Sequence, residues 1–310
     1  IFVETLLIML LGATDVMMLS RYSDDTVASV GVVNQLLSLI FILYGISTLG
    51  TSVLCSQYLG AHQKKNVMQT IGVSLVINLL VGLVVSAGLY VFAPQLLGLM
   101  GLSPQLIDCG KVYMQIVGGF SFLQAIAMTL SATLRSHNQA FYPMYVTLLM
   151  NVLNVGGNYL LIFGKCGFPA LGASGAAVST SVCRLIAMCL LGYLLFRKVV
   201  PNFSFKYLRP FPWDKVKNLM VVGLPAAGEQ VSYNLSQVVI TYFSVLIGTA
   251  ALTARTYAMN IVMFSYVFSI ALGNGAAICI GHLIGAEKDN AAYSVEKYSI
   301  WLSVIITVVI

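Results

Sequence analysis

Long runs of uncharged, mostly apolar residues constrain this chain more than any other feature. Asp, Glu, Lys and Arg are all absent from residues 27–61, 66–107, 112–134 and 256–286. A helix needs about 20 predominantly apolar residues to cross the roughly 30 Å of hydrocarbon in a bilayer. Only 8% of the residues are charged, whereas soluble domains contain about 25%. The sequence therefore predicts an all-α polytopic membrane protein.

Breaks at Gly, Pro and clusters of charge divide the chain into about eight full spans plus part of a ninth. We expect spans at 1–20, 28–58, 67–93, 109–134, 141–163, 173–196, 217–247 and 252–284, with the ninth starting near 292. The connections are short except for the segment 198–216, which combines prolines with basic residues. This segment is predicted to be a loop.

The 16 Lys and Arg residues are distributed unevenly between alternate loops. Lys64, Lys65 and the basic 198–217 loop fall on the same side as the N-terminus. Because basic loops stay on the cytoplasmic side, we expect the N-terminal side and this loop to be cytoplasmic in the inner (plasma) membrane of the cell. The net charge of +6 then needs no nucleic-acid partner. The six cysteines have no metal-binding spacing and are expected to be packing residues.

Two parts of the chain correspond when the sequence is shifted along itself without gaps. The shift that places Glu4 on Glu229 also places Gly50 on Gly275 and the segment 60–62 on 285–287. A repeat of this length holds six spans, so the two copies would be parallel. We expect an N-lobe at 1–197 (helices 1–6), a cytoplasmic inter-lobe loop at 198–216 and a partial C-lobe at 217–310. The whole protein is then expected to be longer, with twelve spans.

Three carboxylates lie within the predicted spans: Glu4, Asp15 and Glu229. A charge at the bilayer centre costs about 2.5–3.5 kcal/mol or more, so each should face a bundle interior or a water-filled cavity. Glu4 and Asp15 share one helix face, and Tyr233 follows Glu229 by one turn. Cation binding is one interpretation of these acids. A structural acid paired with a nearby donor is the alternative, and it applies most to Glu4.

Two amides, Asn154 and Asn158, lie one helical turn apart in the fifth span, and a third, Asn151, lies a turn below them on the same face. Carbonyl and carboxylate oxygens are suited to a weakly held hard cation such as Na⁺. With Asp15 these side chains are candidates for a Na⁺ site. Hydrogen bonds between helices are the alternative role for the amides, and we expect no cofactor besides a coupling ion.

Motifs along essentially the whole chain resemble the multidrug and toxic compound extrusion (MATE) family. In family order they are Asp15, TVASVGVVNQ (26–35), Gly50, QYLGAH (57–62), ATLRSHNQAFYPM (132–144), NVGGNYLLIFG (154–164), FPALGASGAAVSTSVCRL (168–185) and VGLPAAGEQ (222–230). The resemblance implies two six-helix lobes that work by alternating access. It also implies an antiporter that exports cationic or amphipathic organic compounds, driven by Na⁺ or H⁺.

The resemblance further implies a coupling-ion site in the N-lobe. Asp15 matches the first-helix acid of that site, Asn154 its fifth-helix asparagine, and Thr180 its sixth-helix threonine. The family often has an aspartate where this chain has Asn158. That difference removes a negative charge and puts the Na⁺ affinity of the site in doubt.

The seventh helix departs from one branch of the family, which places an acid two turns after the proline. Here Tyr233 takes that place, and Glu229 follows Pro225 by one turn. We expect Pro225 to break the helix and Glu229 to face the cleft between the lobes. Asn34 and Gln35 join Glu229, Glu4 and Tyr233 as candidate ion or substrate ligands. The expected partners are small organic cations and the lipid bilayer, and the expected state is a monomer.

Two alternatives remain open at this stage. GASG (172–175) and GHLIG (281–285) resemble the motifs of rhomboid-type intramembrane proteases, with Ser174 and His282 as the catalytic pair. The predicted topology puts these two residues at opposite membrane faces, too far apart for catalysis. A lipid-linked saccharide flippase of related architecture is the nearer alternative. The excess of intramembrane acids over Arg184, the one base within a span, favours cationic cargo instead.

Overall fold

The computed structural model describes residues 1–309 except 103, 166, 168, 202 and 248. Within these residues it describes all side chains except those of 205, 238, 242, 245–257, 260–261, 263–265 and 309. Regular structure in the described residues is entirely helical. The α-helices are α1 Phe2–Ser20, α2 Asp24–Gly60, α3 Lys64–Val91, α4 Ala93–Leu99, α5 Pro104–Gly119, α6 Ser121–Ser136, α7 Phe141–Phe163, α8 Ala173–Leu194, α9 Trp213–Ile247, α10 Thr249–Gly285 and α11 Asp289–Val309. A π-helical turn, η1 (Leu195–Val199), extends α8, and a 3₁₀ turn, η2 (Phe205–Leu208), precedes α9.

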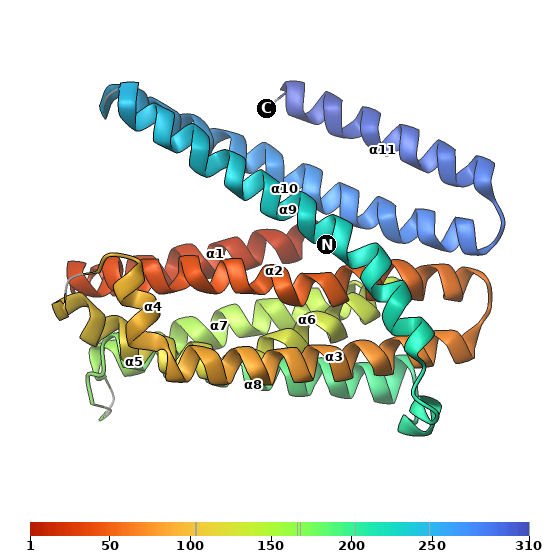
Figure 1. The fold of residues 1–310 in the computed structure, drawn as a ribbon, viewed down its shortest axis with the longest axis horizontal. Helices are drawn as coiled ribbons and strands as arrows, with labels where there is room; N and C mark the ends of the chain where they lie inside the picture. The colour runs from red at the N-terminus through yellow and green to blue at the C-terminus, as the bar shows by residue number, and fades with distance from the viewer. Residues whose placement is uncertain (103, 166, 168, 202, 248, 310) are drawn as a thin grey trace.

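The first eight α-helices form one bundle, and α9 to α11 lie across it (Figure 1). Helices α9 and α10 contact α2 at one end of the bundle, and their other ends, where the two join, lie away from it (Figure 1). Helix α11 packs on α10. The chain is therefore arranged as a bundle with a second helical group attached mainly through α2.

Several helices are suited to a membrane. By length and apolar composition, six segments of the described residues can cross a bilayer, or seven if α5 and α6 form one span bent by 43°. The prediction of a multi-pass all-helical protein is confirmed, whereas the number of eight full spans stays a prediction. Helix α9 begins at Trp213, inside the segment predicted as a loop.

The bend between α5 and α6 divides the span predicted at 109–134. Gly118 and Gly119 precede the break at Phe120, and a turned chain leaves backbone N–H groups without their helical acceptors. The hydroxyl of Ser86 in α3 accepts a hydrogen bond from the N–H of Phe122 at 3.0 Å. Ser121 bonds to both Tyr44 (2.8 Å) and Ser86 (3.0 Å). Neighbouring helices thus satisfy the polar groups that the bend exposes.

The break expected at Pro225 does not occur, and this prediction is wrong. Helix α9 continues through Pro225 from Trp213 to Ile247. A proline removes one backbone N–H, and in membrane helices neighbouring packing compensates for it. Gly223, two residues earlier, lies so close to the carbonyl of Ile46 that a Cβ there would collide with it. Close packing on α2 holds the helix beside the proline.

The contact between α2 and α10 is reciprocal under the shift that places Glu4 on Glu229. A Cβ on Gly60 would collide with the backbone carbonyl of His282, and one on Gly285 would collide with that of Gln57. The same shift places Gly60 on Gly285 and Gln57 on His282. Each of two related segments therefore packs its glycine against the other, as expected for a pseudo-two-fold axis.

The turns that follow these two helices also match. His62 and Glu287, which the same shift superposes, both have positive φ, at 56° and 57°. The N–H of Ala61 bonds to Gln57, and that of Ala286 bonds to His282. The two superposed turns therefore share a backbone conformation, which the turn at Asn138 after α6 also adopts.

A pair of histidines lies at the same end of the bundle. His282 Nε2 donates a hydrogen bond to the carbonyl of Ser136 at the end of α6, at 2.7 Å. His137 Nδ1 donates to the carbonyl of Thr133 at 2.8 Å. Burial, together with the charge of the nearby His282, lowers the pKa of His137 below its ordinary value of 6.5. The contact of α10 with α6 thus lies beside His137, whose imidazole resists protonation.

Substitution of Gly60 by alanine tests the α2–α10 contact. We expect Gly60→Ala to destabilise the protein by about 1–3 kcal/mol, because the backbone it meets cannot move aside cheaply. The matched control is Gly45→Ala in the same helix, where a Cβ has nothing within 4 Å and should stabilise the helix by about 0.5–1 kcal/mol. Thermal unfolding in detergent measures both changes. Equal Tm values for the two variants would contradict the contact.

The pKa of His137 predicts a pH dependence of stability. Because the folded pKa is lowered, the stability contributed by His137 is fully present above about pH 6.5 and is lost as the pH falls towards the folded pKa. We expect the Tm to fall between about pH 7.5 and about pH 5.5, and to fall less in His137→Gln. An unchanged pH profile in that variant would assign the effect to other groups.

Candidate ion-binding site

Four side chains that the sequence analysis selected form one hydrogen-bonded chain in the bundle. Asn158 Nδ2 donates to Asp15 Oδ1 at 2.5 Å and to Asn154 Oδ1 at 2.9 Å. Asn154 Nδ2 in turn donates to Thr180 Oγ1 at 3.3 Å. Helices α1, α7 and α8 therefore bring Asp15, both amides and Thr180 together, and the one-turn spacing of the amides puts both on the same face of α7.

The burial of this position and the oxygen atoms around it are compatible with a small cation. The exposed fractions of Asn154 and Asn158 are 1% and 0%. Among the described residues, the buried Oδ1 of Asn158 has no hydrogen-bond partner. Groups of three or more His, Cys, Asp and Glu that suit a transition metal are also absent from those residues. Carboxylate, amide and hydroxyl oxygens fit Na⁺ or another hard cation, or a proton on Asp15.

A base at this site was missed by the sequence analysis, which counted Arg184 without giving it a role. Its guanidinium lies 5.4 Å from the centre of the Phe41 ring, and its charge acts on the carboxylate of Asp15. Its Nη1 is buried and has no hydrogen-bond partner in the described part of the chain. Its spacing in the sequence could have identified it as a member of the site, because Arg184 follows Thr180 by one helical turn on the same face of α8.

Asn34 and Gln35 of α2 are both exposed. Asn34 Oδ1 accepts a hydrogen bond from the hydroxyl of Tyr113 in α5 at 3.4 Å, and Tyr113 is only 3% exposed. The charges of Asp15 and Arg184 also act on Tyr113. Asn34 is therefore connected to the ion-binding site through one tyrosine, and no such link is found for Gln35 among the described contacts.

Glu229 and Tyr233 lie on α9, apart from the hydrogen-bonded chain. Tyr233 stacks on Tyr266 of α10, with ring centres 6.3 Å apart and planes at 13°. Both rings are substantially exposed, and the charge of Glu229 acts on Tyr266. The result is an accessible aromatic pair with a carboxylate beside it, a combination that attracts organic cations.

Glu4 has a different environment from the other predicted acids. Its Oε1 accepts hydrogen bonds from Arg135 at 2.9 Å and from Ser131 at 3.1 Å, and the residue is 4% exposed. This is the structural pairing that the sequence analysis kept as an alternative. Arg135 neutralises the carboxylate and joins α1 to α6, while Oε2 has no hydrogen-bond partner among the described residues.

The candidate protease pair is not assembled. Ser174 lies in the first turn of α8, and His282 lies in the last turn of α10. These two helix ends are at opposite ends of the bundle (Figure 1). The His282 ring bonds instead to the carbonyl of Ser136.

A multi-pass helical bundle with a hydrogen-bonded acid and amides inside it places the chain among polytopic α-helical membrane proteins. The family model MatE matches residues 1–160 and 225–310. The chain therefore belongs to the MatE family, which confirms the resemblance found in the sequence.

Related proteins agree with this assignment, and solved structures share the fold. The uncharacterized transporter YisQ of Bacillus subtilis is 43% identical over 293 residues, covering 94% of this chain and 64% of that protein. A probable multidrug resistance protein NorM of Thermotoga maritima is 26% identical, covering 99% of this chain and 66% of that protein. A crystal structure of MATE in the straight conformation has a TM-score of 0.88 at 20% identity, covering 98% of this chain and 68% of that chain. The chain thus spans just under two thirds of YisQ and NorM.

The Glu4–Arg135 pair can be tested as a structural element. We expect Arg135→Gln to destabilise the protein by about 3 kcal/mol, because it leaves a buried carboxylate without its counter-ion. Adding Glu4→Gln to that variant should recover most of the loss. Thermal unfolding of the two single variants and the double variant forms the cycle. A double variant as unstable as the sum of the singles would contradict the pairing.

Proposed function

We propose that the protein is a cation-coupled antiporter that exports cationic or amphipathic organic compounds by alternating access. One observation carries the proposal: Asp15, Asn158, Asn154 and Thr180 form a single hydrogen-bonded chain inside the helix bundle of a MatE-family protein. NorM relatives described as probable multidrug resistance proteins support the substrate class. The coupling ion is Na⁺ or H⁺.

In this proposal, ion binding depends on Asn158. Its NH₂ group now faces two acceptor oxygens, on Asp15 and Asn154, while its own carbonyl oxygen is buried without a hydrogen-bond partner in the described residues. Rotation of the amide would turn this oxygen towards the other two. Three oxygens would then surround a cation, with the carboxylate of Asp15 supplying the charge. Protonation of Asp15 would alternatively satisfy the site without a metal ion.

Arg184 acts in this mechanism as a tethered positive charge. Its charge attracts the carboxylate of Asp15 and opposes the arrival of a second cation. Binding of Na⁺ or H⁺ to Asp15 would therefore weaken the attraction between Asp15 and Arg184. In this way the occupancy of the site can change the contacts between α1 and α8, which is what coupling requires.

The cargo would bind on the α9–α10 side. Tyr233 and Tyr266 offer stacked, exposed aromatic faces, and Glu229 adds a negative charge nearby. An aromatic face attracts an organic cation by about 0.5–2 kcal/mol, more when water is excluded. This arrangement supports cationic cargo over the anionic pyrophosphate of a lipid-linked saccharide.

The division into two lobes, 1–197 and 217–310, stays a prediction. In the proposed cycle the α2–α10 contact serves as the pivot. The ends of α9 and α10 that lie away from the bundle would approach and leave it as access alternates.

Replacement of Asp15 by asparagine tests the function. We expect Asp15→Asn to reduce ethidium efflux to the level of protein-free vesicles, because the site loses its titratable and cation-binding charge. The full-length protein is reconstituted in vesicles, and Na⁺ and pH gradients are imposed separately. The gradient that drives wild-type efflux identifies the coupling ion.

The control is Asp25→Asn, which removes an exposed acid from the first turn of α2. Efflux should be unchanged in this variant. Undiminished efflux by Asp15→Asn would overturn the site assignment. Absence of wild-type transport under both gradients would overturn the antiporter and direct the next assay to lipid-linked substrates.

A further inference from the structure

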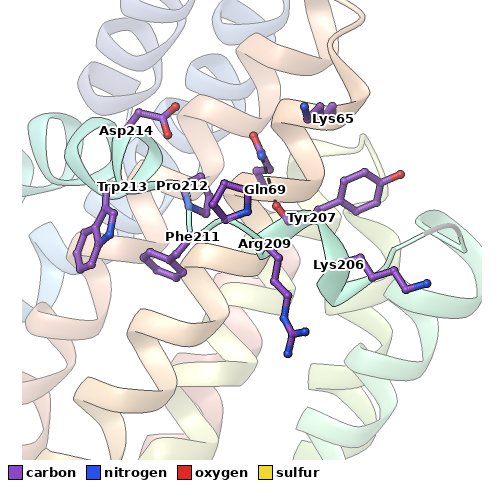
Figure 2. Close-up of a pocket in the computed structure, with 10 residues that line it drawn as sticks. Lys65, Gln69, Lys206, Tyr207, Arg209, Phe211, Pro212, Trp213 and Asp214 are labelled. Carbon is purple, nitrogen blue, oxygen red and sulfur yellow. Dashed lines mark hydrogen bonds between the residues drawn. The ribbon is translucent and has the colours of Figure 1, made fainter.

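A pocket of about 600 Å³ lies outside the candidate ion-binding site, where α3 meets the segment that leads into α9. Lys65 and Gln69 line it from α3, and residues 206, 207 and 209–214 line the rest (Figure 2). Both walls are held together. Gln69 Nε2 donates to the carbonyl of Tyr207 at 3.3 Å, and Leu208 packs against Gly72 without room for a Cβ. We call these lining residues the loop pocket.

Three cations of the loop pocket are exposed: Lys65, Lys206 and Arg209. In the described part of the chain, no carboxylate lies within 4.0 Å of any of them. The pocket contains one acid, Asp214, whose Oδ2 lies 3.4 Å from the Nζ of Lys215. The pocket therefore has an excess of positive charge that can attract an anion.

Lys215 lies behind the pocket and is only 6% exposed. Its Nζ lies 4.6 Å from the centre of the Tyr58 ring and 3.3 Å from the hydroxyl of that residue. Because Lys215 is fixed there, it offsets the charge of Asp214 permanently. Asp214 then does not repel an anion that approaches the three exposed cations.

The loop pocket also has an exposed aromatic edge. Trp213 is 73% exposed, and its ring meets that of Phe211 edge-on at 5.1 Å. Tryptophan is enriched at the boundary between hydrocarbon and headgroups. Lys65 lies in the first turn of α3, a candidate membrane span. The pocket is thus at the depth where lipid headgroups are found.

The directions of the basic side chains separate two sources of an anion. Lys65, Lys206 and Arg209 reach outward in different directions and do not converge on one point (Figure 2). A free phosphate ion needs converging donors, whereas headgroups at a membrane surface can meet each cation separately. The aromatic edge adds contact with apolar chains, which a soluble phosphate lacks.

We propose that the loop pocket binds the phosphate headgroups of anionic phospholipids in the leaflet that contacts the 198–216 segment. Bound lipid would connect α3 with the segment that leads into α9. This site is separate from the candidate ion-binding residues and does not depend on the proposed transport function.

Quenching of Trp213 fluorescence by brominated lipids tests the site directly. The full-length protein, with Trp301 and any further tryptophan replaced by phenylalanine, is reconstituted in bilayers that contain brominated phosphatidylglycerol or brominated phosphatidylcholine. Each basic residue near the surface should favour the anionic lipid by about fivefold at most. We expect phosphatidylglycerol to quench at a several-fold lower mole fraction than phosphatidylcholine.

The variant Lys65→Gln/Lys206→Gln/Arg209→Gln should lose this preference. All three residues are exposed, so the fold should persist, and size-exclusion chromatography checks it. The matched control is Lys217→Gln/Lys288→Gln/Lys297→Gln, which removes the same charge from exposed residues that do not line the loop pocket. The control should retain the preference.

Three outcomes would overturn the proposal. Equal quenching by the two lipids in the wild type would show that the pocket does not select anionic headgroups. Equal loss in both triple variants would assign the preference to net charge and not to this pocket. If inorganic phosphate at millimolar concentration removes the preference, the ligand is a soluble phosphate and not a lipid.

Discussion

The arrangement of this protein depends on the contact between the backbones of α2 and α10. Helices in lipid are not driven together by the hydrophobic effect, since the lipid is as apolar as their side chains. Close approach through glycine gives dispersion contacts that larger residues would prevent. Gly60 and Gly285 provide this approach reciprocally, and Gly223 does so for α9 against α2. The helices after the 198–216 segment are positioned on the bundle mainly through these contacts with α2.

Helix α1 links that packing to the candidate ion-binding site. Near its first turn, Glu4 is fixed by Arg135 of α6, while near its end Asp15 bonds to Asn158 of α7. Glu4 has a counter-ion within the protein, Arg135. Asp15 has an amide partner and lies near the guanidinium of Arg184, whose Nη1 has no hydrogen-bond partner among the described residues. Two carboxylates on one helix face therefore have different environments, one paired with a counter-ion and the other proposed as the site of ion exchange.

The sequence was sufficient for most of the helices and for the members of the hydrogen-bonded chain. Apolar runs and charge clusters mark helix positions because the bilayer admits little else. The charges and amides within the predicted spans supplied Asp15, Asn154 and Asn158, and the resemblance to a known family supplied Thr180. The features that the sequence did not predict depend on contacts between helices that are distant in sequence. The bend at Phe120 depends on Ser86 from another helix, and α9 continues through Pro225 because α2 supports it. Arg135 is distant from Glu4 in sequence, so their pairing was visible only in space. The role of Arg184 likewise emerges from its position beside Asp15 and Phe41.

The turns at His62 and Glu287 combine one backbone conformation with two different side chains. A left-handed conformation is uncommon in residues other than glycine, and it costs about 1 kcal/mol or more. Asn138 after α6 adopts it as well, so this conformation is a general way in which helices of this bundle end. At the two matching positions the conformation fixes the shape of the turn and leaves its chemistry free, with an imidazole at one and a carboxylate at the other. The two turns are alike in shape but not in charge, so each can respond differently to the same aqueous surroundings.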